Sequence, residues 1–179
     1  QQGIASLAAL LLYGQLILYG YWIAAGVVEE KSSRVVEVLL SAIRPRELLV
    51  GKLLGIGALG FAQLLLVSVV GAAAVVASGS LDVPSGAWEA VAVVLAFFVL
   101  GYALYAALFA VAGATVQRQE DLQGSTMPLT ILIVIAFFAA FSAVGDPDGT
   151  LARVLTFVPP CTPMVLPVRL IAGGVAAWE

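Results

Sequence analysis

The chain alternates between long apolar runs and short polar connections. Four runs come close to or exceed the length of about 20 apolar residues that a helix needs to cross a bilayer. They cover about residues 4–28, 53–78, 88–116 and 128–145. None shows the period-2 alternation of a barrel strand, and backbone groups in lipid must pair within their own segment unless a closed barrel forms. We therefore predict an all-α bundle with four membrane-spanning helices.

The fourth run is the shortest of the four, and it opens with a proline. Proline suits the first turn of a helix, where its missing N–H would have had no intrahelical partner. We therefore expect the fourth span to begin at Pro128 and to end near Gly145.

The composition indicates that lipid is the main surrounding of the chain. Of its 179 residues, 62% are hydrophobic and 11% are charged, against roughly 25% charged in an ordinary soluble domain. That is too little polar surface to cover the core of a soluble protein of this size. Because the chain starts at Gln1 and stops at Glu179 beside an apolar stretch, we expect it to be part of a longer protein.

Charge and residue types exclude several kinds of site. The net charge of −3 leaves no basic surface for nucleic acid. A single cysteine, Cys161, excludes an internal disulfide and a cysteine metal cluster. Histidine is absent, which removes the commonest metal ligand and the commonest general base at neutral pH. We expect no metal site and no cofactor.

Basic residues are distributed unevenly among the connections. Two connections that share one side of the membrane hold Lys31, Arg34, Arg44, Arg46, Lys52 and Arg118. The connection at residues 79–87 has no Lys or Arg, and only Arg153 and Arg169 follow the fourth span. The positive-inside rule therefore predicts that residues 29–52 and 117–127 are cytoplasmic and that residues 146–179 lie outside.

Residues 146–179 contain more than a simple loop. The stretch "TLARVLTFV" places Leu151, Val154, Leu155 and Val158 on one helical face, and "PPCTP" then interrupts it. A re-entrant or interfacial helical hairpin explains this mixture of helical and helix-breaking residues. An irregular external cap remains the alternative.

The connection at residues 29–52 combines an apolar stripe with ordered charges. Apolar residues recur at helical spacing at Val35, Val36, Leu39, Leu40 and Ile43. Glu30 precedes Arg34 by four residues, the favourable order for a helical ion pair. Pro45 cannot continue that helix. We predict a protruding amphipathic helix that ends near Arg44, and a second helix that starts with Pro45 in its first turn and continues into the second span.

An enzymatic interpretation of the same connection is the disfavoured alternative, since it would need histidines from further parts of a longer protein. The letters "EEKSSR" read as Glu-Glu-x-x-x-Arg, a pattern in the active site of intramembrane proteases of the prenyl-processing class. Those proteases pair the glutamates with histidines, and this chain has none. The predicted topology also places Glu29 and Glu30 at the membrane rim instead of in a buried pocket. A non-transporting membrane scaffold stays open as another alternative.

Polar groups and glycines inside the spans indicate packing more than chemistry. "GIGALG", residues 55–60, lacks the Lys-Ser/Thr pair of a phosphate-binding loop. We interpret these glycines, with Gly51-x-x-x-Gly55, as sites of close helix packing. No charge lies deep within a span, and an uncharged route suits an amphipathic or lipid-like cargo better than a bare ion. Polar side chains expected to bond or pack between helices are Gln15, Gln63, Ser68, Tyr102 and Tyr105.

Two stretches resemble type-2 ABC transporter permeases. "E-x-x-x-R-x-x-E-x-L-L" followed by "S-A-I-R-P-R-E-L-L-x-G-K", Glu30 to Lys52, is similar to their cytoplasmic segment, in particular in the branch that includes sodium-extrusion permeases and many bacterial exporters. Ala42 departs from the pattern, since many relatives have proline there. "V-P-P-C-T-P-M-V-L-P-V-R", Val158 to Arg169, is similar to their proline-rich external segment before the last span.

The resemblance implies a role and partners. It implies a multi-pass permease subunit of an ATP-driven exporter in the cell membrane, with no ATPase motif of its own. It implies a separate ABC ATPase subunit and a second permease copy or paralogue as partners, and further spans at both ends. The residues that it assigns to ATPase coupling are Glu30, Arg34, Glu37, Leu40, Arg44, Pro45, Arg46, Glu47 and Lys52. Those that it assigns to the external segment are Pro159, Pro160, Pro163, Pro167 and Arg169.

Overall fold

Every regular element in the described part of the chain is an α-helix. The computed structural model describes residues 2–32, 44–77, 87–173 and 175. The helices are α1 (Gln2–Ser32), α3 (Pro45–Ala77), α4 (Ala87–Thr115), α5 (Gln119–Gly145), α6 (Thr150–Thr156) and α7 (Thr162–Ala172). Four of them, α1, α3, α4 and α5, are long and apolar enough to cross a membrane. The predicted all-α fold with four spanning helices is confirmed.

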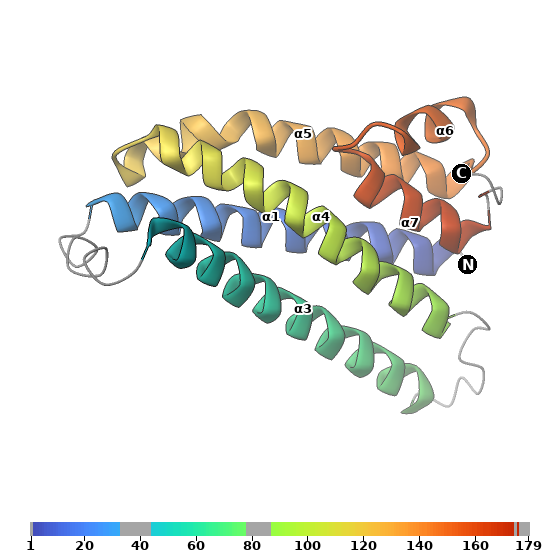
Figure 1. The fold of residues 1–179 in the computed structure, drawn as a ribbon. Helices are drawn as coiled ribbons and strands as arrows, with labels where there is room; N and C mark the ends of the chain where they lie inside the picture. Colours follow the sequence, from blue (N-terminus) through green and yellow to red (C-terminus); the bar gives the residue numbers. More distant parts are fainter. Residues whose placement is uncertain (1, 33–43, 78–86, 174, 176–179) are drawn as a thin grey trace.

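Consecutive long helices run antiparallel, so α1 and α4 share one direction and α3 and α5 the other, and all four share two common ends. α1 and α4 end where α3 and α5 begin, and the short helices α6 and α7 lie at the opposite end (Figure 1). α4, α5 and α7 all pack against α1. α3 packs against α1 and α4, and it diverges from the bundle toward its own C-terminal end. The bundle therefore has a compact part around α1 and one peripheral helix.

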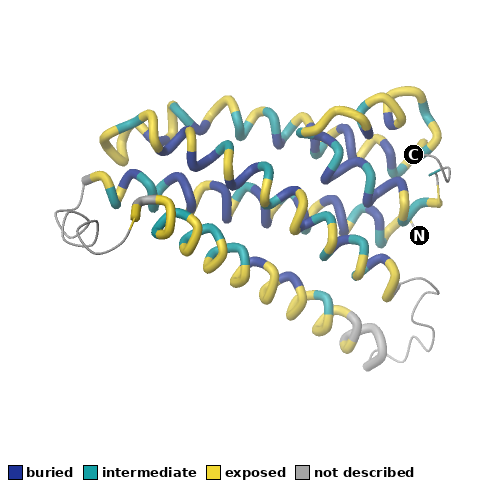
Figure 2. Tube along the Cα trace, in the orientation of Figure 1, coloured by how far each residue is buried: buried dark blue, intermediate teal, exposed yellow. Residues whose placement is uncertain are grey.

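α1 is the central helix of the bundle. Figure 2 shows buried positions along its whole length, while α3 is mostly exposed. The buried residues of α1 are Ala5, Ala8, Ala9, Leu12, Gln15, Leu16, Tyr19, Gly20, Ile23, Ala24 and Val28. Alanines at this helical spacing let neighbouring backbones come close, as small residues do between membrane helices.

Glycines on α4 and α1 allow these two helices to approach each other closely. A Cβ atom at Gly113 of α4 would lie 2.5 Å from the Ala24 carbonyl oxygen of α1, which is backbone and cannot move aside. One at Gly20 of α1 would lie 2.7 Å from the Phe109 ring of α4. The α1–α4 contact therefore depends on the missing side chains of these two residues.

The glycines of α3 divide into two groups, and the packing prediction holds for only one. Cβ atoms at Gly57 and Gly60 would meet the rings of Tyr102 and Phe98 within 2.8 Å, so this face packs against α4. Cβ atoms at Gly51 and Gly55 would meet nothing within 4 Å. The interpretation of Gly51-x-x-x-Gly55 as a packing motif is therefore wrong for the contacts within the described chain.

α5 begins nine residues earlier than the sequence pattern predicts. It starts at Gln119, and Pro128 lies inside it instead of in its first turn. The proline removes one backbone hydrogen bond, but threonine hydroxyls donate to carbonyls of the same helix nearby: Thr126 to Leu122 at 2.9 Å and Thr130 to Thr126 at 3.1 Å. The bond that Pro128 cannot make is the one to the Gly124 carbonyl oxygen, and the helix continues past this single gap because an apolar span must pair its other backbone groups within itself.

Candidate functional site

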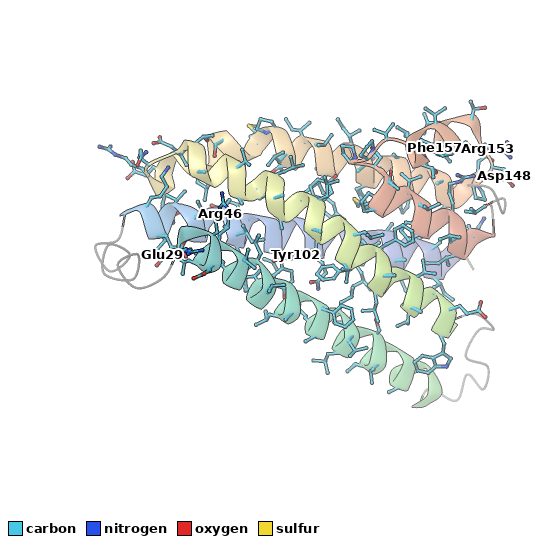
Figure 3. The ribbon with its side chains drawn as sticks, viewed as in Figure 1. Glu29, Arg46, Tyr102, Asp148, Arg153 and Phe157 are labelled. Atoms are coloured by element: carbon cyan, nitrogen blue, oxygen red, sulfur yellow. The ribbon has the colours of Figure 1, made fainter. Side chains whose placement is uncertain are left out.

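The charged residues gather at the two ends of the bundle. The end where α1 and α4 finish and α3 and α5 begin, here called the basic end, holds the described basic residues Lys31, Arg44, Arg46, Lys52 and Arg118. The opposite end, here called the hairpin end, holds Arg153 and Arg169. Figure 3 shows Glu29 and Arg46 at the basic end and Asp148 and Arg153 at the hairpin end. The structure thus brings the described parts of the two predicted cytoplasmic connections to the same end of the bundle.

An ion pair joins α1 to α3 at the basic end. Lys52 Nζ lies 2.5 Å from Glu30 Oε1, and the two side chains are only 20% and 24% exposed. The Lys52 side chain reaches α1 because Gly26 leaves room for it: a Cβ atom there would lie 2.6 Å from Nζ. Two residues assigned to ATPase coupling therefore bond to each other across a helix interface.

Lys31 and Gln119 join α1 to the two remaining long helices. Lys31 Nζ donates to the carbonyl oxygens of Ala114 and Val116, at 2.6 and 3.0 Å, at the C-terminus of α4. A cation suits this position because helix C-termini carry unpaired carbonyls and a partial negative charge. Gln119 Nε2 donates to the Ala25 carbonyl oxygen of α1 at 2.9 Å. At the basic end, α1 is therefore bonded to α3, α4 and α5.

The start of α3 follows the predicted break. Arg44 precedes the helix and Pro45 is its first residue. The Glu47 side chain accepts a hydrogen bond at this end, because the Arg44 backbone N–H donates to Glu47 Oε2 at 3.3 Å. The Glu47 N–H in turn donates to the Arg44 carbonyl at 2.9 Å. This resembles one half of a capping box, with proline in the position that needs no N–H donor. Arg44, Arg46 and Glu47 are exposed.

Part of the predicted coupling segment lies outside the described residues. Arg34, Glu37 and Leu40, with the rest of the apolar stripe, fall within residues 33–43. The amphipathic helix expected there stays a prediction. Of the nine assigned coupling residues, the structure describes Glu30, Arg44, Arg46, Glu47 and Lys52 with their side chains, and Pro45 as part of α3.

The segment after α5 forms a helical hairpin, as one of the two sequence interpretations predicts. α6 and α7 are joined by residues 157–161, which include Pro159 and Pro160. Pro163 is in the first turn of α7, and Pro167 lies inside that helix. α7 packs against α1, α4 and α5, while α6 contacts α5 and α7. The apolar face expected on α6 is exposed at Leu151 and Val154, and Ala152 and Thr156 are buried instead.

The tip of the hairpin reaches the middle of the bundle. The Tyr105 hydroxyl of α4 donates to the Pro160 carbonyl oxygen at 2.6 Å. Tyr105 is the nineteenth residue of this 29-residue helix, so it lies about 27 Å from the start of α4 at the hairpin end. A Cβ atom at Gly101 would lie 2.8 Å from Pro163 and 3.2 Å from Leu16 of α1. The hairpin tip therefore packs among the long helices, as expected for the re-entrant form, and does not rest on the surface of the bundle.

Arg169 is buried inside the hairpin, which the sequence pattern did not indicate. Its side chain is fully buried. Nε donates to the Pro147 carbonyl oxygen at 2.7 Å, and Nη1 donates to Thr156 Oγ1 at 2.8 Å. A buried cation needs such hydrogen bonds, and here they join α7 to α6 and to the turn after α5. By contrast, Arg153 forms an exposed ion pair with Asp148 at 3.3 Å.

Polar side chains hold α3 against the bundle near its middle. Tyr102 donates to the Leu53 carbonyl oxygen of α3 at 2.6 Å, and the Tyr19 hydroxyl of α1 donates to Gln63 Oε1. The expected interhelical role of Gln63 is confirmed. Ser68 bonds within its own helix, to the Leu64 carbonyl oxygen at 2.8 Å, so the interhelical prediction for it is wrong.

Gln15 of α1 is buried among the helices, but its side-chain oxygen lacks a hydrogen-bond partner among the described residues. It is 6% exposed, and its Oε1 atom has no hydrogen-bond partner among the described residues. The expected bond to another helix through this oxygen is therefore not present. Within the part of the chain that the structure describes, no group of three His, Cys, Asp or Glu side chains gathers that could hold a metal ion.

Comparison with known proteins gives two kinds of match. A family model described as ABC-2 family transporter protein matches residues 1–179. The chain is 34% identical over 187 residues to "Uncharacterized protein YhaP" of Bacillus subtilis (strain 168), covering 99% of this chain and 45% of that protein. It is 27% identical over 159 residues to "Uncharacterized protein MJ1024" of Methanocaldococcus jannaschii, covering 89% of this chain and 38% of that protein. The chain thus spans less than half the length of these relatives. No solved structure matches it significantly.

Proposed function

The chain belongs to the ABC-2 family of transporter proteins, and we propose that it forms the membrane-spanning permease part of an ATP-driven exporter. In this proposal the basic end faces the cytoplasm and meets a separate ABC ATPase subunit. The hairpin end faces outside, the membrane is the cell membrane, and a second permease copy or paralogue completes the transporter. The ATP chemistry belongs to the partner subunit.

The observation that carries the proposal is the construction of the basic end. Arg44, Arg46 and Glu47 are exposed at the start of α3, where another protein can contact them. Immediately behind them, Lys52 is paired with Glu30 of α1. A load applied to the start of α3 would therefore pass to α1, which is itself bonded to α4 and α5 at this end.

The attachment of α3 supports a lever-like movement. Its described side-chain bonds to other helices involve Lys52, Leu53 and Gln63, all within the first two thirds of the helix. Beyond them, Leu66 and Val70 are more than half exposed, and α3 diverges from the bundle. We propose that closure of the ATPase dimer pushes the start of α3 and tilts this helix about the contacts near its middle.

The whole of residues 29–52 would provide the contact with the ATPase. Glu30 and Lys52 would transmit the load, and the exposed charges at the start of α3 would bind the partner. The residues outside the described part, Arg34, Glu37 and Leu40, are assigned to the same contact by the family resemblance. Charge reversal at Arg34 is expected to uncouple transport from ATP hydrolysis without preventing membrane insertion.

A charge-reversal pair tests the proposal in the full-length protein, co-expressed with its ATPase subunit. Arg46→Glu places the wrong charge at the exposed start of α3, and Arg153→Glu makes the same change at the hairpin end. We expect Arg46→Glu to lower the co-purified ATPase at least tenfold and Arg153→Glu to leave it unchanged, with equal amounts of both variants in the membrane. Full ATPase retention by Arg46→Glu, or its loss with Arg153→Glu, would contradict the proposal.

A further inference from the structure

A groove lies between α1 and α3 on the outside of the bundle, at the basic end. Its volume is about 670 Å³. Trp22 and Glu30 of α1 form one wall, and Ile56 and Leu59 of α3 contribute to the other. Trp22 and Leu59 are 47% and 53% exposed, so no described residue covers these large apolar side chains.

Two glycines form the floor of the groove. Gly51 and Gly55 both line it, and a Cβ atom at either position would meet nothing within 4 Å. They lie one turn apart on α3, so the absence of both side chains leaves open space on one face of the helix, here called the channel. Gly57 and Gly60, on another face of α3, pack tightly instead. The channel is therefore a feature of the glycine pattern and not of loose packing of α3 in general.

The lining changes from polar to apolar with depth. Glu30, Glu47 and Lys52 lie at the outer end of the groove, and Trp22 and Leu59 lie deeper. From Glu47 to Leu59 the helix rises about 18 Å, close to half the thickness of a bilayer hydrocarbon core of about 30 Å. The groove therefore matches one membrane leaflet in length, with its charged end at the leaflet surface.

The charges at the outer end favour a zwitterionic ligand. Glu30 and Glu47 supply two carboxylates, and Lys52 supplies one ammonium, which bonds to Glu30 and keeps other N–H donors. Among the residues that line the groove, a purely anionic headgroup would meet two carboxylates and one ammonium that is already paired. A headgroup with a phosphate and a primary ammonium matches both signs: the phosphate accepts from Lys52, and the ammonium donates to Glu47.

We propose that this groove binds one zwitterionic aminophospholipid from the leaflet at the basic end, its headgroup between Lys52 and Glu47 beside Gly51 and one acyl chain over Gly55 toward Leu59. A lipid held there would cover the interface at which α3 moves against α1. The inference depends on the membrane location of the chain, and it does not require the proposed transport activity.

The test measures lipids bound to the full-length protein in nanodiscs made of equal parts phosphatidylethanolamine and phosphatidylglycerol with identical acyl chains. After extraction and a delipidating wash, native mass spectrometry counts the lipids retained. We expect one phosphatidylethanolamine per chain in the wild type. Gly55→Leu fills the channel and should lower this retention at least tenfold. Gly71→Leu, at an open glycine of the same helix outside the groove, should not change it.

A second variant tests which lipid headgroup the groove prefers. Glu47→Gln removes the carboxylate that faces the ammonium, and it should abolish the preference for phosphatidylethanolamine over phosphatidylglycerol. Equal retention of phosphatidylethanolamine by the wild type and Gly55→Leu would overturn the site. If another segment or a second copy covers the groove instead, Gly55→Leu would change the mass of the oligomer and not the number of lipids bound, which would also overturn the site. Equal binding of both lipids by the wild type would overturn the assigned class.

Discussion

Arg169 Nη1 donates a hydrogen bond to Thr156 Oγ1 at 2.8 Å, which joins the two helices of the re-entrant hairpin from the inside. The threonine hydroxyl gives its own proton to the Ala152 carbonyl oxygen at 2.8 Å, so it can accept from the arginine. Nε of the same guanidinium holds the Pro147 carbonyl oxygen at 2.7 Å. One buried cation thus fixes α6, α7 and the turn after α5 relative to one another.

Removing this cation should destabilise the protein more than removing an exposed one. Arg169→Met takes charge-assisted hydrogen bonds from two acceptors inside the hairpin, and we expect it to lower the free energy of unfolding by about 3 kcal/mol. Arg153→Met breaks only the exposed pair with Asp148, where about 0.5 kcal/mol or less is expected. Thermal unfolding in detergent measures both. Equal losses would show that the buried bonds do not hold the hairpin.

The hydrogen bond between Tyr105 and the hairpin tip should contribute measurably to stability. Tyr105→Phe leaves the Pro160 carbonyl without its donor, and we expect it to cost about 1 kcal/mol of stability. Tyr21→Phe is the control, because Tyr21 is 44% exposed on the outside of α1. Denaturant titration in mixed micelles compares the two. If Tyr105→Phe is as stable as the control, the hairpin tip does not contact α4 at the position of Tyr105.

The labelling rate of Cys161 also measures how deeply the hairpin tip is buried. Cys161 is buried at the hairpin tip, where a water-soluble reagent has little access to its thiol. A membrane-impermeant maleimide should therefore label native Cys161 at least tenfold more slowly than it labels the double variant C161S/D148C, whose thiol is at the position of Asp148. That position is exposed at the hairpin end. Equal labelling rates in intact membranes would contradict a re-entrant hairpin.

The α1–α4 contact should tolerate no side chain at Gly113. Gly113→Ala drives a Cβ atom against the Ala24 carbonyl oxygen, 2.5 Å away, and the two helices must separate. We expect a loss of about 2 kcal/mol, a typical cost of overpacking. Gly14→Ala on α1 meets nothing within 4 Å and should be neutral or slightly stabilising, since alanine favours helix. Unfolding temperatures that fall equally for both variants would contradict close packing at Gly113.

The spans and their arrangement were accessible from the sequence because lipid imposes a simple rule. Long uncharged runs must form helices, and the connections then alternate between two sides. Pro45 also marked the start of α3 correctly, since a proline at that point ends one helix and suits the first turn of the next. The same reasoning failed at Pro128, which lies inside α5, because one missing backbone bond does not end a helix whose other backbone groups must pair within the span.

What the sequence could not provide is the partner of each side chain. Gly51 and Gly57 are alike in the sequence, yet one lines an open groove and the other packs against Tyr102. Arg169 looked like an external charge, and only the three-dimensional path of the hairpin buries it. At the candidate site, the charges were identifiable, but the Glu30–Lys52 pair across two helices was not, because their pairing depends on how α3 lies against α1.

The most direct test of the central claim is a photocrosslink between the basic end and the ATPase. A benzoylphenylalanine replaces Arg46 in one variant of the full-length protein and Arg153 in another, each co-expressed with the ATPase subunit in its native membrane. Irradiation should give an adduct with the ATPase from position 46 and none from position 153. An adduct from position 153, or none from position 46 while the complex stays assembled, would contradict the account.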